Sequence, residues 1–137
     1  MEDIIFSAKQ VQGKKALFGK GRFALQNVDF ELPSGYIMGI IGENGAGKTT
    51  FFRYIMEEKK HYRGSFYLDG TDIAEDHAWS MNRIGFVSEE RLFLRQKSAR
   101  ENARMLGSFY DTFDMDQFAA LMEQMDLSTD RGEDVAR

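Results

Sequence analysis

Apolar and polar residues alternate in the first part of the chain and then give way to an uninterrupted apolar run. Residues 4–11 and 24–32 show the alternation of half-buried strands, and we expect these two strands to pair antiparallel. Residues 36–41 are apolar throughout, which is typical of a strand buried on both faces, and the turn signal Pro33-Ser34-Gly35 precedes them. The pattern therefore predicts an antiparallel β region followed by a buried strand.

Helical spacing first appears at residues 50–58. Apolar side chains recur there on one face, at Phe51, Phe52, Ile55 and Met56. Residues 63–72 then predict a strand that closes on an Asp-Gly turn, and residues 82–90 predict a short buried strand that leads into a loop.

Two more helices are predicted near the end of the chain. Ser98 and Glu101 form a capping box, and Asp114 is an N-cap with Gln117 three positions on. The second helix carries an apolar stripe made of Met115, Phe118, Leu121, Met122 and Met125. Such a stripe favours a face packed in a core over a methionine-rich groove for a partner.

Between the predicted strand at 36–41 and the predicted helix at 50–58 lies a glycine-rich loop. It fits the phosphate-loop pattern G-x-x-x-x-G-K-[ST] and reads Gly42-Glu43-Asn44-Gly45-Ala46-Gly47-Lys48-Thr49-Thr50. A strand before the loop and a helix after it are the context that this motif requires. The alternative is a glycine-rich turn that binds nothing, and the correct flanks favour nucleotide binding.

The residue types in this loop suit a phosphate. Glycines allow positive φ angles and a close approach of the backbone, so that successive N–H groups converge on the phosphate oxygens. Lys48 is placed to reach the β- and γ-phosphates of ATP or ADP, and the Thr49 hydroxyl to ligate Mg²⁺. A helix that begins near Gly47 directs its positive dipole end at the same anion. We expect the loop residues from Asn44 to Thr50 to hold the cofactor.

Composition narrows the alternatives. A chain of 137 residues with 42% apolar residues is expected to form one domain or part of one, and it contains no cysteine for a disulfide or a thiolate zinc site. His61 and His77 are too far apart to suggest a metal cluster. No apolar run is long enough for a membrane span, and the acidic start does not resemble a secretory signal, which is consistent with a cytoplasmic protein. A net charge of −4 does not indicate a basic surface for binding nucleic acid.

The order of these motifs resembles that of the ATP-binding subunits of ATP-binding-cassette (ABC) transporters. The bend Phe18-Gly19-Lys20, the alternating strand at 24–32, the Pro-x-Gly turn and the narrow filling Asn44-Gly45-Ala46 carry the resemblance. In this family an aromatic residue at the bend stacks on adenine, a role that falls by position to Phe18. The alternative is that Phe18 is a core residue of a hairpin and that Phe23 exchanges roles with it.

The last residues of the segment 82–90, where the predicted strand leads into a loop, depart from the family pattern. The family carries Pro-Gln where this chain has Ser88 and Glu89, and the glutamine contacts Mg²⁺ and the attacking water. A glutamate ligates Mg²⁺ and accepts hydrogen bonds, but it adds charge and cannot donate. The resemblance makes Glu89 a candidate metal ligand and catalytic residue. The alternative is a solvent-facing Glu89-Glu90 pair without a role.

The resemblance covers nearly the whole chain but only the N-terminal half of the family's domain. The signature loop and the Walker B carboxylates have no match, since Leu127-Ser128-Thr129-Asp130 lacks the paired glycines. We therefore predict an α/β P-loop NTPase fold with an N-terminal antiparallel β subdomain and the start of a helical subdomain, truncated before those motifs. The expected divisions are 1–90 for the nucleotide-binding core, 91–126 for the helical part and 127–137 for a linker.

The resemblance implies an ATPase subunit that couples ATP hydrolysis to transport. The implied partners are a membrane-spanning subunit and a second ATPase subunit in a head-to-tail dimer, with no nucleic acid and no insertion into the membrane. It implies a location at the inner face of the cell membrane. Two alternatives stay open: a cassette ATPase outside transport, and a truncated product that binds nucleotide without hydrolysing it. We expect this chain alone not to be hydrolytically competent.

Overall fold

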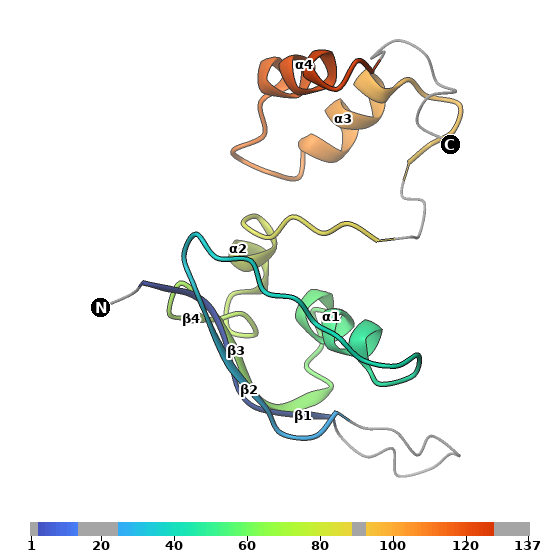
Figure 1. The fold of residues 1–137 in the computed structure, drawn as a ribbon. Coiled ribbons are helices and arrows are strands. Elements are labelled where there is room, and N and C mark those ends of the chain that lie inside the picture. Colours follow the sequence, from blue (N-terminus) through green and yellow to red (C-terminus); the bar gives the residue numbers. More distant parts are fainter. Residues whose placement is uncertain (1–2, 14–24, 89–92, 128–137) are drawn as a thin grey trace. The chain divides into compact units, whose positions relative to one another are not determined.

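The computed structural model describes residues 3–13, 25–88 and 93–127. Contacts between residues divide the chain into two compact units, Met1–Met81 and Asn82–Arg137. The first unit holds a sheet and two helices, and the second holds a pair of helices with the segment that precedes them (Figure 1). The division expected from the sequence at residue 90 stays a prediction.

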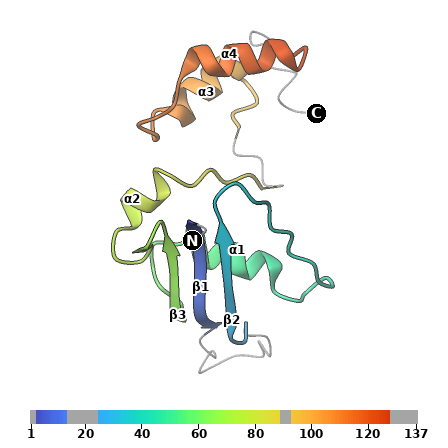
Figure 2. The ribbon, with the colours of Figure 1, turned by 60° about the vertical axis from the view of Figure 1, so that its left-hand side comes forward.

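The first unit is organised around an antiparallel sheet of strand order β2-β1-β3-β4. Its strands are β1 (Ile4–Gly13), β2 (Val28–Pro33), β3 (Tyr62–Leu68) and β4 (Thr71–Asp72). Strand β1 pairs antiparallel with both β2 and β3, as Figure 2 shows. The alternation at residues 4–11 and 24–32 and the Asp-Gly turn at the end of β3 are thereby confirmed.

Phe66 of β3 is the centre of an aromatic core on one face of this sheet. Its side chain is fully buried, and its ring centroid lies 5.5 Å from that of Phe51, 5.9 Å from that of Phe6 and 5.2 Å from that of Tyr62. Phe51 belongs to helix α1 (Lys48–Met56), which lies against the sheet (Figure 1). Burial of large rings is the main source of stability in such a core, so the sheet fixes where α1 begins.

A bulge in β1 depends on a glycine in the facing strand. Gln10 has φ 51°, and its N–H donates to Asp29 Oδ1 at 2.8 Å, so the ladder shifts register there. Gly64 opposite has φ 79°, and a Cβ at this position would overlap the backbone oxygens of Lys9 and Gln10. Only glycine satisfies both conditions.

Two predicted strands are absent from the described structure. Residues 36–41 pair with no strand, and the side chains of Ile37 and Ile41 are both 99% exposed. Residues 82–88, the described part of the strand predicted at 82–90, likewise form no strand, and Val87 is 95% exposed. Both predictions were wrong for one physical reason. A strand buried on both faces needs neighbouring strands beside it, and the described sheet provides none at these two segments.

The helical predictions are confirmed with small changes in their bounds. Helix α1 is Lys48–Met56, with Phe51 and Ile55 buried, whereas Phe52 is 42% exposed. A short helix, α2 (His77–Met81), was not predicted. In the second unit, α3 (Ala99–Gly107) and α4 (Met115–Gln124) begin at the predicted caps, Ser98 and Asp114.

The expectation that the apolar stripe of α4 forms a core is wrong for two of its five residues. Leu121 and Met125 are 54% and 60% exposed, and α4 has no buried residue. Phe118 and Met122 instead line an apolar cavity of about 370 Å³ that they share with α3. In the described part of this unit α3 is the helix that packs on α4, and it covers only one side of the stripe.

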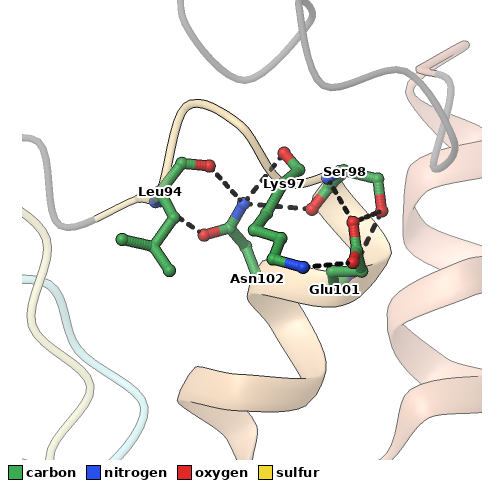
Figure 3. Close-up of polar contacts among 5 residues, drawn as sticks. All are labelled: Leu94, Lys97, Ser98, Glu101 and Asn102. Atoms are coloured by element: carbon green, nitrogen blue, oxygen red, sulfur yellow. Dashed lines mark hydrogen bonds and ion pairs between the residues drawn. The ribbon is translucent and has the colours of Figure 1, made fainter.

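Asn102 holds the loop that precedes α3 (Figure 3). Its Oδ1 accepts from the Leu94 N–H at 2.8 Å. Its Nδ2 donates to the carbonyl oxygens of Leu94 at 3.1 Å, Lys97 at 3.2 Å and Ser98 at 3.0 Å. The residue is 2% exposed, so one buried amide satisfies four backbone groups and fixes the loop on the helix.

The capping box of α3 is complete and carries an ion pair. Ser98 Oγ accepts from the Glu101 N–H at 3.2 Å, while Glu101 Oε2 accepts from the Ser98 N–H at 2.9 Å. Lys97 Nζ lies 2.9 Å from Glu101 Oε1. The hydrogen bond from Lys97 and the backbone hydrogen bond from Ser98 lower the pKa of Glu101 to about 2.

Candidate nucleotide-binding site

The glycine-rich loop connects residues 36–41 to α1 in the first unit. Residues 42–46 are exposed and Gly47 is buried at the first turn of the helix. The Ala46 N–H donates to the Glu43 carbonyl oxygen at 3.0 Å, which closes a tight turn. The loop therefore projects from the sheet with its own internal turn.

Gly47 gives the loop its direction into α1. It is the N-cap residue, with φ 99° and ψ 8°, and Gly45 has φ 87°. These angles belong to the left-handed region that glycine adopts without strain. No side chain caps α1, so the first N–H groups of the helix are left for a ligand. This geometry suits an anion at the positive end of the helix dipole.

Lys48 is folded over the loop that precedes it. Its Nζ donates to the carbonyl oxygens of Gly42 and Glu43, the second at 2.9 Å. The ammonium group thus lies inside the loop, held by two neutral oxygens. Charged phosphate oxygens accept stronger hydrogen bonds than carbonyls do, so a phosphate in this loop competes well for the same ammonium.

Thr49 and Thr50 follow in the first turn of α1, and Thr49 is exposed. Within the described ranges, no group of three or more histidine, aspartate or glutamate side chains is arranged to hold a metal ion. Mg²⁺ bound with a nucleotide needs few protein ligands, because phosphate oxygens and water supply the rest. The Thr49 hydroxyl beside the phosphate loop fits this requirement.

Phe18 and Glu89 lie outside the described residues, so their predicted roles remain predictions. The structure brings together the loop residues from Asn44 to Thr50 and adds one feature that the sequence did not indicate. A small apolar cavity of about 170 Å³ lies beside Gly47 and Lys48, lined among others by Val28, Phe30 and Phe51. The sequence placed Val28 and Phe30 only within the strand predicted at 24–32, since a sequence pattern does not show that a strand borders a loop.

Comparison with known protein families shows to which family this chain belongs. A family model described as ABC transporter matches residues 25–137. The chain belongs to the ABC transporter family. The match includes the whole phosphate loop and α1, and also both helices of the second unit.

Similar proteins within this ABC family are ATP-binding proteins of bacteria. The chain is 37% identical over 89 residues to the ABC transporter ATP-binding protein NatA of Bacillus subtilis, covering 64% of this chain and 36% of the relative. It is 31% identical over 100 residues to the lipopolysaccharide export system ATP-binding protein LptB of Escherichia coli K12, covering 72% of this chain and 42% of that protein. A methionine import ATP-binding protein MetN of Histophilus somni is 44% identical over 91 residues, with 64% and 26% covered.

A solved ATP-binding subunit of an ABC transporter has the same fold. Its TM-score is 0.72 at 20% identity, and the alignment covers 90% of this chain and 51% of the solved chain. This ABC family chain thus has the P-loop NTPase fold that the sequence predicted. It spans about a third to two-fifths of the length of NatA and LptB.

No helix among the described residues is both long and apolar enough to cross a bilayer.

Proposed function

We propose that this chain is the ATP-binding portion of an ABC transporter ATPase subunit, which couples ATP binding and hydrolysis to transport across a membrane. The observation that carries the proposal is the phosphate loop with Gly47 at φ 99° as an uncapped helix start and Lys48 Nζ folded into the loop. This arrangement presents backbone N–H groups and one ammonium group to a single anion. The relatives include an import protein and an export system, so the proposal does not extend to the direction of transport.

Each site residue has a distinct part in this proposal. The N–H groups of residues 44–48 and the Lys48 ammonium neutralise the phosphates, and the Thr49 hydroxyl, with Glu89, holds Mg²⁺. Phe18 stacks on the adenine ring. Mg²⁺, when bound, neutralises the charge that develops on the phosphate oxygens.

The exposed apolar stripe of α4 supports a protein partner in the second unit. Leu121 and Met125, which are four residues apart, are 54% and 60% exposed. Apolar side chains gathered on one surface mark sites of protein association. The proposed partners are a membrane-spanning subunit, which would keep the protein at the inner face of the membrane, and a second ATPase subunit.

The test is a calorimetric titration of the 137-residue chain with ATP and Mg²⁺. Lys48→Ala removes a charge-assisted contact and is expected to weaken binding by about 1.5–3 kcal/mol, roughly ten- to hundredfold. Lys59→Ala is the matched control, because Lys59 is an exposed lysine outside the loop, and its affinity is expected to equal that of the wild type. Equal affinity of all three proteins would contradict the proposal.

A further inference from the structure

The glycine-rich loop contains the one asparagine of this chain that is followed by glycine. The chain has asparagine at positions 27, 44, 82 and 102, and only Asn44 precedes a glycine, Gly45. Asparagine is among the chemically labile residues of proteins. The backbone nitrogen of the next residue can attack its side-chain amide carbon, and glycine hinders this attack least because it has no Cβ.

Asn44 and Gly45 are the two central residues of the tight turn in this loop. The turn is closed by the hydrogen bond from the Ala46 N–H to the Glu43 carbonyl oxygen at 3.0 Å, and Gly45 has φ 87°. Both central residues are exposed. In the described part of the chain no hydrogen bond involves the Asn44 side chain or the Gly45 N–H. The attacking nitrogen and the amide carbon are therefore both accessible.

The other three asparagines lack one or more of these conditions. Asn102 is 2% exposed and its amide makes four hydrogen bonds. Asn82 donates to Asp111 Oδ2 at 2.7 Å and accepts from the Asp111 N–H at 3.1 Å. Asn27 is exposed, but the β-branched Val28 follows it and hinders the attack. Asn27 is thus an exposed comparison site within the same chain.

We propose that Asn44 is a site of spontaneous deamidation, which inactivates the phosphate loop and which bound nucleotide suppresses. The Gly45 nitrogen loses its proton to a base in the solvent and forms a bond to Asn44 Cγ, and the side-chain nitrogen leaves as ammonia. One water molecule then opens the resulting five-membered succinimide at either carbonyl. The products are aspartate and isoaspartate at position 44. In sum, an amide and water become a carboxylate and ammonium, without an oxidant or a reductant.

Either product changes the loop where a phosphate would bind. A carboxylate at position 44 places a negative charge beside the N–H groups and the Lys48 ammonium, and like charges brought together oppose binding. Isoaspartate also inserts a methylene group into the main chain, which turns the N–H groups of the loop away from a common point. Both products therefore weaken the binding of a phosphate.

Suppression by nucleotide rests on the proposed function, in which the N–H groups of residues 44–48 bind the phosphates of ATP. The attack requires the Gly45 nitrogen to lose its proton and the Asn44 side chain to rotate toward it. A hydrogen bond from the Gly45 N–H to a phosphate oxygen retains this proton and fixes the turn. Asn44 is then converted only in the fraction of molecules whose site is empty.

The first experiment follows each asparagine by peptide mass spectrometry while the 137-residue chain is incubated at mildly alkaline pH. Without nucleotide, Asn44 is expected to convert roughly tenfold or more faster than Asn27. Mg-ATP at about ten times its dissociation constant is expected to slow Asn44 by roughly tenfold and to leave Asn27 unchanged. Adenosine, which carries no phosphate, is the control ligand and is expected not to slow Asn44.

The second experiment measures the ATP affinity of aged protein by calorimetric titration. Fully converted wild type is expected to bind ATP roughly tenfold or more weakly than fresh wild type, and fresh Asn44→Asp should show the same weakening. Asn44→Gln is the matched variant, because its longer side chain would have to form a less favourable ring. It is expected to keep its own starting affinity during the same incubation, so a loss in the wild type does not reflect general ageing.

Three results would overturn the proposal. Equal conversion of Asn44 and Asn27 without nucleotide would do so, whether or not the chain binds ATP. So would undiminished conversion of Asn44 under Mg-ATP that calorimetry shows to be bound, or an unchanged ATP affinity after full conversion. Fast conversion of Asn44 in a fresh chain that binds no ATP would support the modification site and contradict the proposed function instead.

Discussion

At the scale of single residues, Asn102 shows how one buried amide determines the path of a loop. Four backbone groups between Leu94 and Ser98 bond to its side chain, and Asn102 itself is 2% exposed. An asparagine inside a helix is neutral or unfavourable by propensity, so nothing in the local sequence singles it out. Its importance comes from the loop that folds back onto it.

Asn102→Ala should therefore destabilise the second unit strongly. The substitution removes the hydrogen bonds of a side chain that is 2% exposed and leaves the Leu94 N–H and the Lys97 carbonyl oxygen without this partner, and the expected loss is about 2–4 kcal/mol in the free energy of unfolding. Gln124→Ala, which removes an exposed amide from α4, is expected to change it by less than about 0.5 kcal/mol. Denaturation followed by far-ultraviolet circular dichroism measures both. A loss as small as that of Gln124→Ala would show that the four hydrogen bonds contribute little.

Phe18 is a second residue-scale prediction, and it rests on the sequence alone. If its ring stacks on adenine, Phe18→Ala weakens ATP binding by roughly 1–3 kcal/mol and leaves the binding of inorganic triphosphate unchanged. Phe23→Ala is the matched control, since Phe23 is the nearby phenylalanine that could exchange roles with it. Calorimetric titration of each variant with ATP and with inorganic triphosphate measures the two affinities. Equal weakening of ATP and triphosphate would make Phe18 a packing residue.

At the scale of elements, the helices and strands that are specified by residues close to them in the sequence were predicted correctly. Those that need distant partners were not. Helices α3 and α4 begin where expected because Ser98, Glu101 and Asp114 bond to backbone groups within their own first turn. The hairpin partners β1 and β2 were found because their alternation marks one buried face. The strands predicted at 36–41 and 82–90 did not form in the described chain, because such strands depend on neighbours that their own residues do not specify.

The capping box of α3 makes the stability of that helix depend on pH. The pKa of Glu101 is lowered from 4.5 to about 2 by the hydrogen bonds from Lys97 and Ser98. A lowered pKa means that the folded state favours the ionised carboxylate. This stabilisation is fully present above the ordinary pKa and is lost as the pH falls through about 2.

Glu101→Gln tests this dependence. The variant is expected to be less stable than the wild type at pH 7, because the ion pair with Lys97 is lost, and the difference should vanish as the pH approaches about 2. Unfolding midpoints in urea at several pH values measure it. Lys97→Ala should show a smaller effect with the same direction, since the backbone hydrogen bond from Ser98 remains. A difference between Glu101→Gln and the wild type that does not change with pH would contradict the lowered pKa.

At the scale of the whole molecule, the sequence-based predictions agree with the structure for features formed by residues close together in the chain. They differ from it for burial that depends on residues far apart in the chain. The phosphate loop, α1 and the antiparallel sheet form the first unit, and the capped helices belong to the second. The exposure of Ile37, Ile41 and Val87 was not foreseen, since a long apolar run by itself indicates burial. Which residues bury such a run is a property of the complete fold.

The last prediction concerns catalysis by the chain as a whole. We expect the 137-residue chain to bind Mg-ATP without sustained turnover. Phosphoryl transfer to water needs a group that orients the water and charge that stabilises the transferring phosphoryl group. After Glu90 the sequence has neither an apolar run followed by Asp-Glu nor a loop with paired glycines. The chain should release phosphate under saturating Mg-ATP no faster than Lys48→Ala does.

Glu89 is the one carboxylate that offers another route, so it defines the decisive comparison. If Glu89 acts as a weak base, turnover would be measurable in the wild type and would disappear in both Glu89→Ala and Lys48→Ala. Glu90→Ala is the matched control, because it removes the adjacent carboxylate and should keep whatever activity the wild type has. Steady phosphate release with this pattern of loss would show that the chain hydrolyses ATP by itself. Absence of release together with calorimetric binding would leave it a nucleotide-binding portion whose catalytic groups come from elsewhere.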